Sequence, residues 1–71
     1  MVSRAILLDW RARLSRELRE IEGVGAINIS ETGTGIEIRV KSKSDKQTQK
    51  IEDVFERRGA DAIPYKIVLA G

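Results

Sequence analysis

The chain has 71 residues, with 13 Lys and Arg against 11 Asp and Glu, and a formal net charge of +2. It contains no cysteine and no histidine, which excludes the usual zinc, iron–sulfur and thiol chemistries and any His-based triad or general base. A chain of this length makes one domain, residues 1–71, whose thin core needs close packing or a partner subunit for stability.

The first predicted element is an amphipathic helix that begins after Ser3, a residue type favoured at the N-cap. Its apolar stripe recurs at helical spacing and consists of Leu7, Trp10, Leu14, Leu18 and Ile21. Because Gly23 suits the left-handed position after a last turn, we expect the helix to end at Glu22. The arginines at positions 4, 11, 13, 16 and 19 are interpreted as a solvated face, with an anionic docking surface as the alternative.

Two strands joined by a short loop are predicted next. The alternation of residues 24–30 indicates a half-buried strand. Residues 31–35, E-T-G-T-G, suit a hairpin loop with at least one positive φ, and they lack the Gly-Lys-Ser/Thr ending of a phosphate loop. Residues 36–40 then alternate more regularly than any other stretch. The apolar face of this hairpin is expected to carry Ile27, Ile29, Ile36, Ile38 and Val40.

A second helix and a last strand complete the chain. Ser44 and Gln47, three residues apart, form a capping box at the start of the helix, and Gly59 ends it. The inner face of the helix is expected to consist of Ile51, Val54, Phe55 and the stem of Arg58. Pro64 favours the start of a strand or an edge strand. The side chains of the last strand that point into the core are expected to be Tyr65, Ile67 and Leu69.

The order α-β-β-α-β predicts an α+β fold, a two-layer sandwich in which both helices cover one face of a three-stranded sheet, related to the ferredoxin-like fold. The four-stranded ferredoxin-like sheet has a central strand between the hairpin and the last strand, which this chain lacks. Either the last strand pairs directly with the hairpin, or a strand edge stays open. The open face is expected to carry Asn28, Ser30, Glu37, Arg39, Lys41, Lys66 and Val68.

Residue chemistry argues against an enzyme. No pair of carboxylates has a spacing diagnostic of acid–base catalysis, so we expect no catalytic residue, no cofactor and no metal. Three cations of the open face, Arg39, Lys41 and Lys66, form a candidate surface for a partner or an anion. Tyr65 is expected in the core, so the strands offer no aromatic side chain on which bases could stack.

Short stretches of the chain resemble known families. The α-β-β-α-β order, I-E-G-V-G-A-I-N-I at residues 21–29 and D-A-I-P-Y-K-I-V-L at residues 61–69 resemble the ring-building motif of sporulation, type III secretion and flagellar ring proteins. That resemblance implies a non-catalytic module that packs side by side with its own copies. L-x-x-I-E-G-V and K-I-E-D-V-F-E-R-R-G-A are similar to heavy-metal-associated domains, whose Cys-x-x-Cys is missing here. G-V-G and I-P-Y-K-I-V-L-A-G resemble leader domains of bacterial trypsin-like proteases.

The leading hypothesis is a non-catalytic protein-interaction or self-association module. An exposed strand edge of a small sheet is a template for another chain, and a two-fold homodimer would cover it. The alternative is a nucleic-acid-binding module that uses Arg39, Lys41 and Lys66 for backbone contacts. No apolar run approaches the roughly 18–20 residues of a membrane span, and none matches a signal-peptide core. We therefore expect a protein partner, no membrane span and, by default, a cytoplasmic location.

Overall fold

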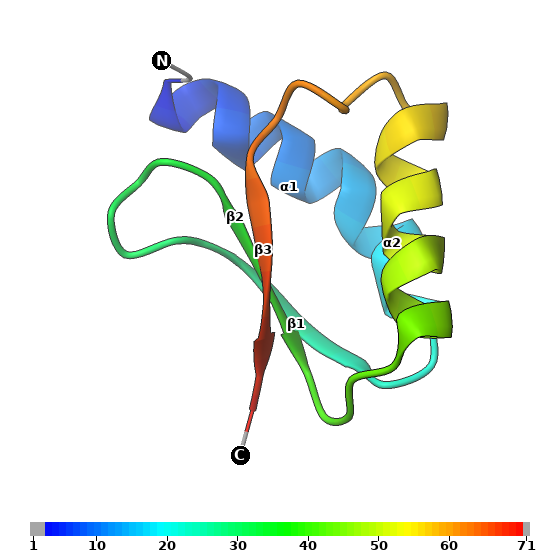
Figure 1. Cartoon of the computed structure of the whole chain (residues 1–71). Coiled ribbons are helices and arrows are strands. Elements are labelled where there is room, and N and C mark those ends of the chain that lie inside the picture. The colour runs from blue at the N-terminus through cyan, green and yellow to red at the C-terminus, as the bar shows by residue number, and fades with distance from the viewer. Residues whose placement is uncertain (1–2, 71) are drawn as a thin grey trace.

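The computed structural model describes residues 3–70 and confirms the predicted α+β fold. Its elements, in chain order, are α1 (Arg4–Arg19), β1 (Val24–Ile29), β2 (Ile36–Val40), α2 (Asp45–Arg57) and β3 (Tyr65–Leu69). Figure 1 shows the two helices on the same side of the sheet, with the hairpin loop and the end of β3 projecting away from them. The molecule is therefore a two-layer sandwich in which one sheet face is left uncovered.

α1 is capped as predicted but ends earlier than predicted. The Ser3 hydroxyl accepts a hydrogen bond from the Ile6 N–H at 3.3 Å. At the other end, Glu20 and Ile21 donate to carbonyls three residues back instead of four, so the helix tightens and stops at Arg19 rather than Glu22. Gly23 has a φ of 89°, the left-handed conformation that the sequence predicts. This turn directs the chain into β1.

β2 is the central strand of the sheet. β1 pairs with it antiparallel and β3 pairs with it parallel, in the order β1-β2-β3. The last strand therefore pairs directly with the hairpin, which leaves β1 and β3 as the two edges. In this register Ile38 lies between Ile27 and Ile67. A bulge-type register shift between Val24 and Ala26 was not predicted from the sequence.

The core lies between the helices and one face of β2. Ile36, Ile38 and Val40 are each fully buried, as the alternation predicts. The helices bury against them Leu7, Leu14, Leu18, Ile51, Val54 and Phe55. The Phe55 and Tyr65 rings stack with centroids 4.2 Å apart and an interplanar angle of 23°, which joins α2 to β3.

Three predicted positions differ in the structure. Leu69 is 56% exposed rather than buried, because it ends an edge strand that has a neighbour on one side only. Arg58 is exposed, and its guanidinium pairs with the Glu17 carboxylate of α1 instead of laying its stem on the core. Ser30 is buried rather than on the open face, because its hydroxyl accepts hydrogen bonds from the N–H groups of Thr34 and Gly35 in the hairpin loop.

Candidate functional site

Two of the three predicted surface cations meet on the open face of the sheet, with a carboxylate between them. Arg39 Nε donates to Glu37 Oε2 at 3.0 Å, and Lys66 Nζ lies 3.7 Å from Glu37 Oε1. The hydrogen bond from Arg39 and the two positive charges lower the pKa of Glu37, against the opposing effect of burial. Glu37 therefore stays ionised at neutral pH and engages both cations.

Lys41 lies apart from this cluster. It follows the last residue of β2, its side chain is exposed, and its N–H donates to the Gly23 carbonyl at 2.7 Å. The structure thus brings Arg39 and Lys66 together through Glu37 and places Lys41 beyond the end of the strand. Nucleic-acid binding through the three cations stays a prediction.

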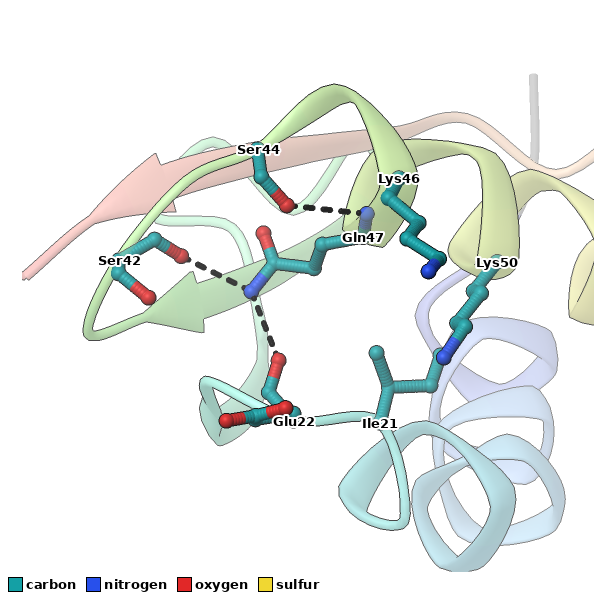
Figure 2. Close-up of a pocket in the computed structure, with 7 residues that line it drawn as sticks. All are labelled: Ile21, Glu22, Ser42, Ser44, Lys46, Gln47 and Lys50. Atoms are coloured by element: carbon teal, nitrogen blue, oxygen red, sulfur yellow. Dashed lines mark hydrogen bonds between the residues drawn. The ribbon is translucent and has the colours of Figure 1, made fainter.

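A shallow pocket lies at the start of α2, where the two loops at this end of the sheet meet. The close-up in Figure 2 draws its lining residues, which are Ile21, Glu22, Ser42, Ser44, Lys46, Gln47 and Lys50. Gln47 is 5% exposed, and its Nε2 donates to the Glu22 carbonyl at 3.1 Å and to the Ser42 carbonyl at 2.9 Å.

The capping box at this pocket is formed only by half. The Ser44 hydroxyl accepts from the Gln47 N–H at 3.2 Å, as the sequence predicts. The Gln47 amide does not return a bond to the cap, because it bridges the α1–β1 and β2–α2 loops instead. Its Oε1 is buried and has no partner in the part of the chain that the structure describes. The main role of Gln47 in this pocket is therefore to join the two loops.

The two edges of the sheet differ in how their backbone groups are engaged. Just after β1, the Ser30 N–H donates to the Gly35 carbonyl. Along an antiparallel ladder, every second residue directs its N–H and C=O toward the partner strand, so the N–H and C=O of Ile27 point away from β2. Arg11 Nε of α1 donates to that Ile27 carbonyl at 2.8 Å. A side chain from the helix layer thus covers the middle of the β1 edge, a common protection against unwanted strand pairing.

The β3 edge has no such cover among residues 3–70. The Pro64 carbonyl accepts from the Ile36 N–H at 2.9 Å, and the Ala70 N–H donates to the Val40 carbonyl at 2.8 Å. These groups face β2, so by the alternation of a parallel ladder the backbone groups of Tyr65, Ile67 and Leu69 face outward. Within the described residues no further strand lies on that side.

Two kinds of side chain lie near the β3 edge: the partly buried Tyr65 of the strand itself, and acidic side chains of α2. Burial, helped by the negative charges of Glu52 and Glu56, raises the pKa of the Tyr65 hydroxyl above its ordinary value. Glu52 and Glu56 are exposed and follow the core residues Ile51 and Phe55 along α2. We call this pair the acidic flank of α2.

Comparison with protein-family models, with curated proteins and with solved structures gave no match. Neither α1 nor α2 has the length and hydropathy needed to cross a membrane. Within residues 3–70, no three acidic side chains are gathered closely enough to hold a metal ion.

The sequence did not predict that a side chain covers the β1 edge and that the β3 edge lacks such a cover among residues 3–70. Pro64 did carry a signal, because proline favours the start of a strand or an edge, and it directly precedes the edge strand β3. No local signal pointed to Arg11, whose partner Ile27 lies sixteen residues away in the chain.

Proposed function

We propose that this domain is a non-catalytic protein-interaction module whose binding surface is the free edge of β3. The observation that carries the proposal is the outward-facing backbone of Tyr65, Ile67 and Leu69, which lies in an edge strand without the side-chain cover that Arg11 gives to β1. Such an edge binds an added strand through main-chain hydrogen bonds, and pockets for alternate side chains supply specificity.

The composition of β3 supports this function. Y-K-I-V-L is rich in β-branched and aromatic residues, which pair well across strands. Its one charge belongs to Lys66, whose ammonium group is near Glu37 on the open face and does not project along the edge. Edge strands that avoid partners usually carry charges or bulges, and β3 has little of either. The resemblance to ring-building motifs points toward the same class of function.

A proline at position 69 tests the proposal. The Leu69 N–H faces outward, so Leu69→Pro removes a donor from the edge without removing a hydrogen bond to β2. We expect peptides selected from a random phage-displayed library on the wild-type protein to bind the variant at least about tenfold more weakly, since a main-chain hydrogen bond contributes about 0.5–1.5 kcal/mol and the ring also blocks the adjacent pairing. Fluorescence anisotropy with the selected peptides measures the difference.

The matched control is Leu69→Thr, which removes the same apolar side chain and keeps the N–H. Peptides that bind this variant nearly as well as wild type, and that slow amide exchange at Tyr65, Ile67 and Leu69, support strand addition. Failure to select any peptide would contradict the proposal. Equal binding to the wild-type and Leu69→Pro proteins would place the binding surface elsewhere and contradict it as well.

A further inference from the structure

We infer that the strand added to β3 is the β3 of a second copy, paired antiparallel about a two-fold axis at Ile67, so that two three-stranded sheets join into one. This inference rests on the proposed function and names the partner of the same edge. A two-fold arrangement is closed, because the same edge is used by both copies.

The backbone register is self-complementary. With Ile67 opposite Ile67 of the second copy, Tyr65 lies opposite Leu69, and these are the residues whose N–H and C=O groups face outward. Every outward donor of this strand then faces an outward acceptor. A shift by one residue sets outward groups against inward ones, and a shift by two leaves an outward residue of each strand without a partner.

The side chains fit the same register. Leu69, 56% exposed in the monomer, comes beside the Tyr65 ring of the second copy, which already stacks on Phe55. Aromatic and aliphatic side chains directly opposite each other stabilise antiparallel pairs. On the open face Lys66 lies opposite Val68, so the two lysines are not set against each other. Each Lys66 also keeps Glu37 of its own chain as a neighbour, 3.7 Å away.

The state of the β1 edge favours a closed dimer over a head-to-tail assembly of many copies. Pairing of β3 with β1 of a second copy would be head-to-tail and would leave a free edge at each end of the assembly. It would also have to displace Arg11 from the Ile27 carbonyl. Pairing of β3 with β3 leaves two β1 edges at the ends, and both are already covered.

The charges beside the edge predict how salt acts on the dimer. Two-fold pairing brings the acidic flanks of both copies, Glu52 and Glu56, to the same side of the joined sheet. Like charges repel, and salt screens the repulsion. Dimerisation should therefore strengthen with salt, whereas an acidic flank placed against a basic surface would give the opposite dependence.

Disulfide trapping tests the register directly, because the natural chain has no cysteine. Lys66 and Val68 face each other in a non-hydrogen-bonded pair, in which the Cα atoms are about 4.5 Å apart, within disulfide reach. The Lys66→Cys/Val68→Cys double variant should form a covalent dimer under mild oxidation. Lys66→Cys alone is the matched control and should react much more slowly, since its two cysteines lie on a diagonal about 7–8 Å apart.

Sedimentation of the wild-type chain provides the second measurement. We expect a species of twice the 8.0 kDa chain mass that grows with protein concentration and with salt, and that Leu69→Pro abolishes. A single 8.0 kDa species at sub-millimolar concentration, or equally fast trapping of the single and double cysteine variants, would overturn the inference. If library peptides still bind the edge in that case, the proposed function stands and only the identity of the partner is wrong; if they do not, both fall.

Discussion

At the scale of single residues, Gln47 joins the two loops at the end of the β1–β2 pair opposite the hairpin loop. Its amide nitrogen donates to backbone carbonyls of two different loops, and it is almost fully buried. Both hydrogen bonds are partly buried, so water replaces them only incompletely when the amide is removed. The residue therefore contributes to folding through tertiary bridges and less through the capping motif in which it was predicted.

Replacement of Gln47 by alanine should lower the free energy of unfolding by about 1–3 kcal/mol, since the two partly buried hydrogen bonds that join the loops are lost. Equilibrium unfolding in denaturant measures this change. The matched control is Gln49→Ala, which makes the same substitution in the same helix at an exposed position where the amide donates to the Asp53 carboxylate. We expect the control to change stability by no more than about 0.5 kcal/mol. Equal effects of the two substitutions would show that the bridge contributes nothing.

At the scale of elements, the hairpin loop fixes where β3 can begin. Gly33 has a φ of 71°, so it supplies the left-handed position that the sequence predicts for this loop. Gly35 has a different role, because its φ is not positive and a Cβ there would lie 2.7 Å from the Pro64 carbonyl oxygen. The second glycine of T-G-T-G thus allows the residue before β3 to approach the hairpin closely.

Gly35→Ala should push the start of β3 away from β2. We expect a loss of about 1–3 kcal/mol in stability, as for other overpacked positions, and faster amide exchange in β3 than in β1. Gly25→Ala is the control, because its Cβ would approach only the Arg39 carbonyl, at 3.4 Å, and it should cost clearly less. If the two alanine variants were equally stable, the close approach at Pro64 would have no energetic weight.

At the scale of the whole molecule, the two edges of the sheet differ in how their outward backbone groups are covered. Arg11 covers β1 from the helix layer, while β3 presents its backbone groups outward. α1 and α2 are joined across the layer by Glu17, which pairs with Arg57 at 3.5 Å and also with Arg58. In the proposed dimer, one covered and one free edge would limit association to a closed pair, whereas two free edges would allow extended assembly.

Arg11→Ala should remove this limit. Without the guanidinium, the Ile27 carbonyl and its neighbours become a second free edge, and we expect light scattering to detect species larger than a dimer at concentrations where the wild type shows none. Arg13→Ala is the control, because Arg13 pairs with Asp9 at 3.1 Å on the exposed side of the same helix. Adding Leu69→Pro to Arg11→Ala should suppress the large species. Unchanged scattering from Arg11→Ala would show that β1 is protected by something other than Arg11.

Much of the fold could be predicted from the sequence, since each element carries its own local signals. Helical and two-residue periodicities gave the order and the buried faces of the elements. Ser3 and Ser44 gave the helix starts, Gly23 gave a positive-φ position that the structure confirms, and Gly59 marked the end of the second helix. For the candidate site, the sequence left open whether the last strand pairs with the hairpin or a strand edge stays open, and the structure shows the pairing. The sequence also supplied three cations that the structure does not gather into one patch.

The sequence by itself determined which segments form helices and strands and which of their faces are apolar, because those properties depend on residues a few positions apart. The tertiary structure alone decided that β3 lies beside β2, that Lys66 lies beside Glu37, and that Arg11 reaches Ile27. These contacts join residues far apart in the chain, and their geometry exists only once the helices have packed on the sheet. The identity of the free edge therefore follows from packing, and Pro64 was the one local signal that pointed to it.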